Sequence, residues 1–314
     1  MNRCLYCYLP LTQSETDFHA ACSKKIFDQP IPPELPYTED KMVELATQVI
    51  RTHVTVTGVQ AKLSLHLTTG ENKNAPKRFT IVGLWGDYIL KPPTPHYPQL
   101  PEVEDLTMHL AALAKIKVVP HSLIRLQSGH LAYITKRIDR YKKEKRHMED
   151  MCQLTEKLTE DKYHGSYEQV AKIILKYSTN PGLDVVNYFE QVLFSFLTGN
   201  ADMHLKNFSL INDGEGYTLA PTYDMVATTL VNPTDDEDMA LTLNGKKKKL
   251  KRADFISTFN TVKLDAKQQD NIFNKMEKAH PKWVALIDNS FLSTDYKQTF
   301  KTLIHDRFNR LAAK

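Results

Sequence analysis

The chain has 314 residues, of which 41% are hydrophobic and 25% are charged, and its formal net charge is +4 at pH 7. A chain of this length is too long for a single small domain and fits a two-lobed enzyme, because single domains typically contain about 100–200 residues. The composition excludes a collagen-like or wholly disordered chain, and the apolar stretches are far shorter than the roughly 18 residues of a membrane span. The small net charge does not by itself indicate nucleic-acid binding.

Three of the four cysteines and one histidine lie within the first 25 residues. Cys4, Cys7, His19 and Cys22 follow the pattern C-x2-C-x11-H-x2-C, which is two pairs, each spaced to hold one side of a tetrahedral zinc ion. Four protein ligands would make that zinc structural, because no position is left for water. The alternative is that the reduced cysteines pack as small apolar residues beside a surface histidine. This polar N-terminus has no signal-peptide core, so we expect a cytoplasmic protein.

The next hundred residues mix helices with short strands. A proline-rich connector at residues 29–36 cannot be helical. Apolar residues at helical spacing predict helices over Glu39–Thr52 and Glu102–Ile116. Short apolar runs predict five strands, at Lys62–Thr68, Arg78–Trp85, Tyr88–Lys91, Ser122–Leu126 and Leu131–Lys136.

Beyond about residue 147 the pattern is mainly helical. Leu183–Leu197 is apolar on nearly every side, which predicts a buried central helix, and Tyr167–Tyr177 predicts a helix before it. The remaining predicted elements are strands at Asn207–Ile211 and Tyr217–Ala220 and helices near 252–261, 264–278 and 295–312. The sequence therefore predicts an α+β fold with a Cys/His segment at 1–28, a β-rich N-lobe at 37–145 and a helical C-lobe at 146–314.

The segment that leaves the buried helix places Asp202 five residues before Asn207. Phosphoryl transfer needs a carboxylate to accept the hydroxyl proton, and an amide oxygen and a second carboxylate to hold magnesium. The protein-kinase catalytic loop has the same Asp-to-Asn spacing. Asp224 follows a predicted strand seventeen residues later, where it can meet Asn207. Each fragment alone is also explained by turn formation, but together and in this order they favour a kinase.

Two further segments offer groups that suit phosphates. Residues 53–64 contain one glycine, Gly58, among hydroxyls and backbone amides, although the pattern is neither a P-loop nor a GxGxxG loop. Lys91 closes an apolar strand, so its ammonium can reach phosphates while its stem stays buried. Considered alone, residues 53–64 could equally be a strand that enters a turn, and Lys91 could equally be a solvated lysine.

In combination these motifs resemble the HipA-like kinases, which are toxin components of bacterial toxin–antitoxin systems. The resemblance implies a two-lobed, protein-kinase-like fold. Six segments fall in the family's order between residues 55 and 225: Thr57–Ser64, Tyr88–Pro93, Ile134–Arg140, His147–Gln153, Gly199–Ser209 and Leu219–Asp224. Leu243–Gly245 and Arg252–Phe255 extend the likeness.

The resemblance implies a role for each of these residues in ATP- and magnesium-dependent phosphorylation of serine or threonine. Asp202 would be the catalytic base, with Asn207 and Asp224 on magnesium. The residues implied to bind ATP are Lys91, the phosphate loop Val56, Thr57, Gly58, Val59 and Gln60, and also His204 and Lys206. In the family a hydroxyl residue of this loop is autophosphorylated, which expels the loop and switches the kinase off; here the matching residues are Thr55 and Thr57, where relatives mostly carry serines. His147, Glu149 and Asp150 match a family motif that we interpret as architecture.

The resemblance also implies partners. The chain begins about fifty residues before the phosphate loop, and so resembles the short HipT type, whose missing N-terminal subdomain is encoded as a separate small protein. Expected partners are that protein, an antitoxin, and an aminoacyl-tRNA synthetase as substrate. DNA would be reached only through an antitoxin, and no membrane is expected.

Two other functions stay open. One is an antitoxin-binding co-repressor scaffold, which the basic run Lys246–Lys251 and the Cys/His segment slightly favour, although such runs are usually solvated faces. The retention of Asp202 together with Asn207 argues against scaffolding as the sole role. The other is a small-molecule or lipid kinase, which would use the same centre.

Overall fold

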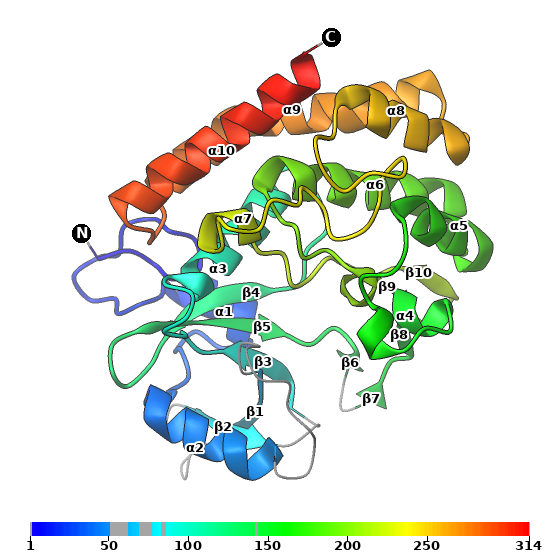
Figure 1. The fold of residues 1–314 in the computed structure, drawn as a ribbon. Coiled ribbons are helices and arrows are strands. Elements are labelled where there is room, and N and C mark those ends of the chain that lie inside the picture. Colours follow the sequence, from blue (N-terminus) through cyan, green and yellow to red (C-terminus); the bar gives the residue numbers. More distant parts are fainter. Residues whose placement is uncertain (1, 51–61, 69–76, 83–85, 142–143, 314) are drawn as a thin grey trace. The chain divides into compact units, whose positions relative to one another are not determined.

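The computed structural model describes residues 2–50, 62–68, 77–82, 86–141 and 144–313. The chain forms two compact units (Figure 1). The first comprises Met1–Asp105, Val119–Ile138 and Asn289–Phe291, and the second comprises Leu106–Val118, Asp139–Asp288 and Leu292–Lys314. Within the described residues, none of the helices combines the length and the apolar character that crossing a membrane requires.

The first unit is built on a five-stranded antiparallel sheet with the strand order β2-β1-β3-β5-β4. Its strands are β1 (Leu63–Thr68), β2 (Arg78–Val82), β3 (Tyr88–Lys91), β4 (His121–Arg125) and β5 (Leu131–Lys136). Helices α1 (Ala20–Phe27) and α2 (Glu39–Ile50) belong to the same unit, as does the first part of α3 (Leu100–Leu113). The β-rich character predicted for this part of the chain is confirmed.

Aromatic side chains form the centre of the first unit. Phe27 of α1 packs against Phe18 and Phe79 with ring centroids 5.4 and 5.8 Å apart, and Phe79 packs edge-on against Tyr88 at 5.3 Å. All four rings are buried, and each contributes roughly 1.5–3 kcal/mol through the apolar area it removes from water. The cluster therefore ties the N-terminal segment to strands β2 and β3.

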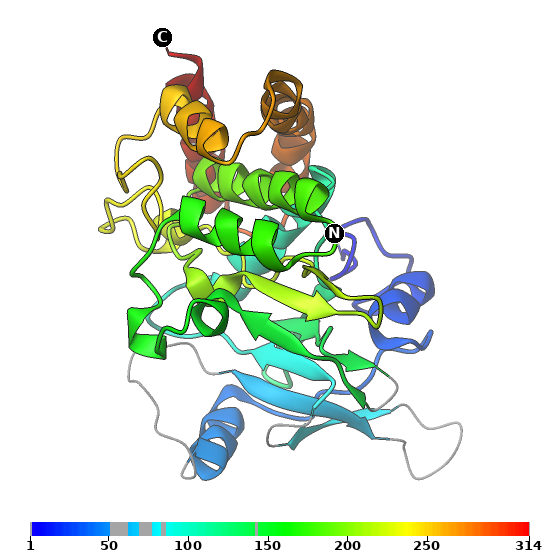
Figure 2. The ribbon, with the colours of Figure 1, turned by 90° about the vertical axis from the view of Figure 1, so that its right-hand side faces the viewer.

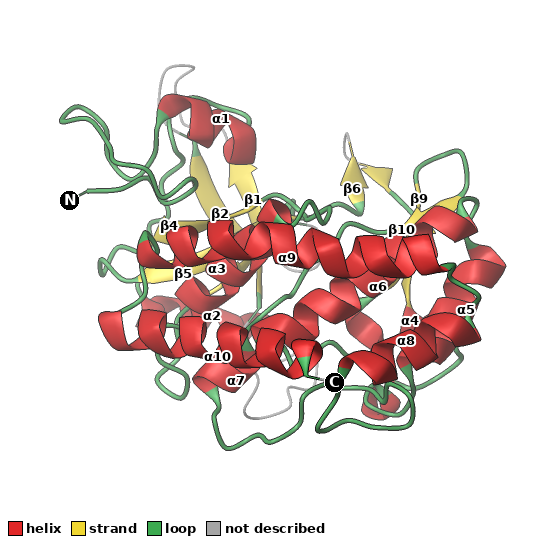
Figure 3. Cartoon of the chain, turned by 90° about the horizontal axis from the view of Figure 1, so that it is seen from above, coloured by secondary structure: helices red, strands yellow, loops and turns green. Residues whose placement is uncertain are grey.

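The second unit is mainly helical and carries a small antiparallel sheet of order β10-β9-β8. Its helices are α4 (Met151–Leu154), α5 (Tyr167–Tyr177), α6 (Pro181–Thr198), α7 (Thr228–Val231), α8 (Arg252–Thr261), α9 (Ala266–Asp288) and α10 (Thr294–Ala312). Its strands are β8 (Met148–Asp150), β9 (Ser209–Asn212) and β10 (Tyr217–Leu219), and a hairpin of β6 (Arg140–Tyr141) and β7 (Glu144–Lys145) precedes them. Figure 2 shows α5 and α6 side by side above β9 and β10, and Figure 3 shows the long helices α9 and α10.

Helix α6 is the core of the second unit, as its all-round apolar pattern predicted. Every residue from Tyr188 to Thr198 is buried. Its rings meet those of the surrounding helices: Phe189 packs on Phe259 at 5.0 Å, Phe196 on Phe255 at 5.3 Å and Phe194 on Trp283 at 5.4 Å. A helix buried in this way has a fixed C-terminal end, and the candidate site starts there.

Some predicted boundaries are wrong for local reasons. Helix α3 ends at Leu113 and not at Ile116, because Lys115 adopts the left-handed φ of +58° and the Ile116 N–H caps the Ala111 carbonyl. Helix α9 continues through Pro281 to Asp288, ten residues beyond the prediction. The buried Trp283 lies in that extension.

Short elements were not predicted. Helices α4 and α7 contain four residues each, which is too few for a periodicity of 3.6 to be visible. The strand predicted for Arg78–Trp85 ends at Val82, and residues 83–85 lie outside the described part of the chain.

The basic run at 246–252 is paired with acidic residues close by in the sequence. Lys246 contacts Asp254 at 2.7 Å, Lys247 contacts Glu237 at 3.3 Å, and Lys248 contacts Asp236. The charges of these three lysines are therefore compensated by acidic residues nearby, in agreement with the interpretation of this run as a solvated surface.

Asp238 is the buried centre of this acidic segment. Its carboxylate is bound by Arg307 and Arg310 of α10 and accepts the Leu250 N–H at 3.1 Å. Both guanidinium groups also lie over the Phe196 ring, at 4.9 and 5.2 Å. Burial acts to raise the pKa of Asp238, but the hydrogen bonds and charges of the two arginines outweigh it, so the pKa is lowered.

We predict that Asp238→Asn lowers the free energy of unfolding at pH 7 by about 2–4 kcal/mol, because it leaves the buried Arg307 charge uncompensated. A lowered folded-state pKa means that the stabilisation is present above the ordinary value of 3.8 and is lost as the pH falls through the folded value. Urea unfolding at pH 7 and at pH 3 measures both effects. Asp236→Asn, at an exposed pair, is the control, and an equal unfolding midpoint for both variants would contradict the account.

Candidate active site

The candidate site starts where α6 ends. Gly199 has φ +67°, and the N–H groups of Gly199 and Asn200 cap the carbonyls of Phe196 and Ser195. This left-handed cap turns the chain sharply out of the buried helix, a conformation that favours glycine. The turn leads into residues 200–208, in which Asp202 and Lys206 are partly exposed and the other residues are buried.

Hydroxyl groups hold the backbone of this segment in place. The Thr228 hydroxyl accepts the Ala201 N–H at 2.8 Å. The Tyr167 hydroxyl donates to the Met203 carbonyl at 3.1 Å, and the Tyr223 hydroxyl donates to the Lys206 carbonyl at 3.0 Å. Tyr167 is itself fully buried in the helical core. The segment is therefore a rigid loop even though it carries little regular structure.

The side chain of Asn207 lies against the backbone of Asp202. The Asn207 side chain donates from Nδ2 to the Asp202 carbonyl at 2.8 Å, and that same carbonyl accepts the His204 N–H at 2.8 Å. A carbonyl can only accept, so the amide nitrogen must face it, and Oδ1 of Asn207 takes no part in this bond. The strand predicted from Asn207 is wrong at its start: Asn207 lies in the 3-10 turn η2 (Leu205–Asn207), and β9 begins at Ser209.

Asp224 follows β10 and has φ +60°. Left-handed backbone is uncommon for residues other than glycine, although aspartate tolerates it better than most. Such conformations are concentrated at functional sites. The Asp224 carboxylate is one of the charges that raise the pKa of His204, as is that of Asp202.

His204 is buried, with only 6% of its surface exposed. Burial lowers its pKa, and the positive charge of Lys162 adds to this effect, while Asp202 and Asp224 act in the opposite direction. The ring is therefore neutral at pH 7. Its Nδ1 is buried without a hydrogen-bond partner among the described residues, and so is Nδ2 of the neighbouring Asn200. Unpaired buried polar atoms on both sides of Asp202 fit a site that receives a polar ligand.

Tyr163 was not singled out from the sequence. Its hydroxyl donates to Asp202 Oδ1 at 2.6 Å, and its ring lies edge-on to His204 at 5.0 Å. Burial and then the bond to Asp202 raise the pKa of Tyr163, so its phenol keeps its proton and remains a donor. One lone tyrosine in a loop carries no spacing signal that could have identified this role.

Lys206, which the resemblance assigns to ATP, pairs with Asp150 at 2.8 Å. The other oxygen of Asp150 caps α4 by accepting the Gln153 N–H at 3.0 Å. His147 contacts the Tyr217 hydroxyl at 2.8 Å. The motif at 147–150 thus joins β8 to α4, to β10 and to the loop at 200–208, which agrees with its interpretation as architecture.

Lys91 belongs to the first unit and lies at the end of β3. Its ammonium binds Glu104 of α3 at 2.5 Å and stands 5.4 Å from the centre of the Tyr133 ring. Both Lys91 and Glu104 are buried. Protein kinases pair their strand β3 lysine with a helix glutamate in the same way. Glu104 was not predicted, although a glutamate on the helix following the lysine strand was the available signal.

The structure also brings the predicted zinc ligands together. We call Cys4, Cys7, His19 and Cys22 the Cys/His cluster; their sulfur and nitrogen atoms all lie within 4.8 Å of one another. The predicted phosphate loop, Val56, Thr57, Gly58, Val59 and Gln60 with Thr55, lies outside the described residues.

The donor atoms of the second unit fit a magnesium ion. Mg²⁺ prefers oxygen ligands and is usually held by one or two protein side chains together with substrate phosphates. Oδ1 of Asn207 and the Asp224 carboxylate offer such oxygens, and His204 and Asn200 of the same segment as Asn207 carry buried polar atoms without a partner among the described residues. Asp202, Asn207 and Asp224 are of the residue types that phosphoryl transfer requires, namely a carboxylate, an amide and a second carboxylate.

A family model described as the HipA-like C-terminal domain matches residues 54–284. The chain belongs to this family. Similar proteins include "Putative kinase Y4mE" of Sinorhizobium fredii, 31% identical over 184 residues, which are 56% of this chain and 42% of that protein. The "Putative kinase" of Haemophilus influenzae is 29% identical over 249 residues, 73% of this chain and 69% of that protein. The chain thus spans less than half of the first relative's length.

Two solved structures share the fold. HipA of Shewanella oneidensis MR-1, solved with HipB and operator DNA, has a TM-score of 0.69 at 20% identity, over 82% of this chain and 65% of that one. The proinflammatory kinase CtkA of Helicobacter pylori has a TM-score of 0.56 at 16% identity, over 79% of this chain and 93% of that one. The predicted α+β, HipA-like and kinase-like fold class is therefore confirmed.

We predict that Gly199→Ala destabilises the protein by at least about 1–2 kcal/mol, because an L-residue is strained at φ +67°. The added Cβ would also lie 2.7 Å from Leu303 Cδ2. Gly182→Ala, at the other end of α6 in open space, is the matched control and is expected to be neutral or to gain up to about 0.5–1 kcal/mol. Chemical denaturation compares the two, and equal stabilities would contradict the assigned cap.

Proposed function

We propose that this chain is an ATP- and magnesium-dependent kinase that phosphorylates serine or threonine hydroxyls of a protein. The observation that carries the proposal is the hydrogen bond that holds Asn207 against Asp202. The charge of Asp224 acts, together with that of Asp202, on the pKa of the buried His204. The membership of residues 54–284 in the HipA-like family supports it, as do relatives that are named as kinases.

In this proposal Asp202 accepts the proton of the substrate hydroxyl. Its bond from Tyr163 engages Oδ1 and thereby orients the carboxylate, so that Oδ2 is the oxygen that faces the substrate. Asn207 and Asp224 would hold magnesium, which when bound shields the charge on the ATP phosphates. Neutral His204 and the cation of Lys206 would contact ATP from the same loop, and Lys206 would exchange Asp150 for phosphate oxygens.

Lys91 would hold the ATP phosphates from the first unit. Its bond to Glu104 fixes the position of the ammonium group at the end of β3. Residues 56–60 would form the phosphate loop, and phosphorylation of Thr55 or Thr57 would place negative charge where ATP needs room. This provides a physical basis for an inhibitory self-modification.

We further propose that the chain is the toxin of a HipBA- or HipBST-type toxin–antitoxin system and acts in the cytoplasm on an aminoacyl-tRNA synthetase. HipA of Shewanella oneidensis was solved with HipB and operator DNA, which supports an antitoxin as a partner here. The pairing of Lys246, Lys247 and Lys248 with acidic neighbours favours contact with DNA only through that antitoxin. A separate N-subdomain-like protein is the second expected partner.

We predict that Asp202→Asn reduces phosphate transfer by about 10²–10⁴-fold, because the amide cannot accept the hydroxyl proton. Intact-mass and peptide mass spectrometry after incubation with Mg-ATP measures this, with the phosphate expected on Thr55 or Thr57 of the wild type. Asp213→Asn, an exposed residue in the turn after β9, is the control and should retain full transfer. Undiminished transfer by a folded Asp202→Asn variant would overturn the assignment of the base.

The same assay separates the competing functions. A folded wild-type protein that binds no ATP and gains no phosphate would favour the antitoxin-binding scaffold. A protein that consumes ATP without phosphorylating itself, its partners or a synthetase would favour a small-molecule substrate.

A further inference from the structure

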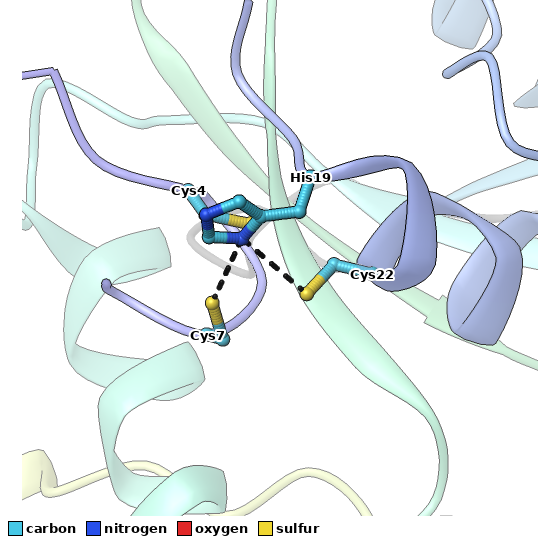
Figure 4. Close-up of side chains that lie close together, drawn as sticks. All are labelled: Cys4, Cys7, His19 and Cys22. Atoms are coloured by element: carbon cyan, nitrogen blue, oxygen red, sulfur yellow. Dashed lines mark hydrogen bonds between the residues drawn. The ribbon is translucent and has the colours of Figure 1, made fainter. Parts of the chain in front are cut away.

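The Cys/His cluster has the geometry of a metal site, and the proposed kinase function gives it no role. Cys4 and Cys7 come from the N-terminal loop, His19 immediately precedes α1, and Cys22 lies in its first turn (Figure 4). His19 Nδ1 is 3.4 Å from the Cys7 sulfur and 3.7 Å from the Cys22 sulfur. Cys4 and Cys22 are buried, and all four cysteines of the chain are free thiols.

The histidine is oriented as a metal ligand would be. His19 Nε2 donates to the Pro10 carbonyl at 3.0 Å, because a carbonyl can only accept. That bond places the proton on Nε2 and leaves Nδ1, the atom facing the sulfurs, as a lone-pair donor. Metal-ligating histidines typically donate their second ring N–H to a carbonyl or carboxylate in this way.

The backbone between the ligands is also constrained. Cys4 and Leu9 are joined by a hydrogen bond of 2.9 Å, and the Tyr8 N–H returns to the Cys4 carbonyl at 2.9 Å. Tyr8, directly after Cys7, has φ +64°, which residues other than glycine seldom adopt without an external constraint. This turn brings the sulfur atoms of Cys4 and Cys7 to one place, together with the donor atoms of His19 and Cys22.

We propose that the Cys/His cluster binds a structural zinc ion. Three thiolates and one imidazole are a ligand set for which zinc is the usual occupant, with tetrahedral geometry. All four positions are filled by protein, so no water is activated and the ion stabilises the fold. Binding releases the thiol protons and forms four metal–ligand bonds, without any change in oxidation state.

The segment that carries the Cys/His cluster contacts helix α3, which also carries Glu104, the partner of Lys91. The Tyr8 hydroxyl donates to Asp105 Oδ2 at 2.7 Å, and Asp105 Oδ1 contacts His121 Nδ1 at 2.7 Å. Asp105 is the neighbour of Glu104 in α3, and Glu104 binds Lys91. Zinc thus stabilises the turn that carries Tyr8, and Tyr8 fixes α3 beside the proposed ATP-binding lysine. This second step rests on the proposed kinase function, whereas the zinc site does not.

Metal analysis of the full chain, purified without chelators from zinc-supplemented culture, tests the site. We expect about one zinc per wild-type chain and a loss of most of it in Cys4→Ser and Cys22→Ser. Cys152→Ser, at a buried cysteine of the second unit, is the matched control and should keep its zinc. A folded wild type with no more zinc than Cys4→Ser would overturn the proposal.

A second measurement remains valid if the cysteine variants do not fold. Cobalt added to wild-type protein stripped of metal should give the visible absorption bands of tetrahedral cobalt with thiolate ligands, and added zinc should displace them. Octahedral cobalt bands, or none, would exclude the site.

Tyr8→Phe tests the second step, because it keeps all four ligands and removes only the hydroxyl that binds Asp105. We expect unchanged zinc content and a KM for ATP raised roughly three- to tenfold, with little change in kcat. Tyr8 is then a positioning residue. Unchanged zinc with an unchanged KM would overturn the link to Lys91 and leave the zinc site standing.

Discussion

The buried end of helix α6 is the constraint on which the candidate active site depends. Rings from α8 and α9 surround this helix, and its C-terminal end cannot shift without opening that core. Gly199 turns the chain out of the helix, and Tyr167, Tyr223 and Thr228 fix the next residues from three directions. Asp202 therefore receives its position from the hydrophobic core of the second unit. The geometry is set before any ligand arrives, which is the condition for electrostatic stabilisation of a transition state.

The charged groups of the two candidate sites differ in burial and in pairing. In the first unit Lys91 and Glu104 form a buried pair, so the ammonium has a defined place despite the flexibility of a lysine side chain. In the second unit Asp202 and Asp224 are only partly buried, and the charges of both act on the neutral imidazole of His204. A partly exposed acidic group can accept a proton or a cation, whereas a buried ion pair maintains a position.

Much of this could be predicted from the sequence, because the decisive signals were local. The uniform apolar character of Leu183–Leu197 predicted a buried helix, and the Asp-to-Asn spacing singled out the segment that follows it. The sequence signal was insufficient where distant segments supply the contact: Tyr163 reaches Asp202 across 39 positions, and Tyr8 reaches Asp105 across 97. Pairings of that kind depend on tertiary packing, which no periodicity records. Glu104 is an intermediate case. Its partner Lys91 was singled out from the sequence, but the helix that carries Glu104 was predicted only from its apolar spacing, so the ion pair was missed.

The central claim is that Asn207 and Asp224 form a metal–ATP centre distinct from the base, Asp202. Calorimetric titration of ATP with and without magnesium, on wild type, Asp224→Asn and Asp202→Asn, tests it most directly. The account predicts that magnesium strengthens ATP binding to wild type and to Asp202→Asn, and that Asp224→Asn loses this dependence. Equal magnesium dependence in wild type and Asp224→Asn would contradict the assignment.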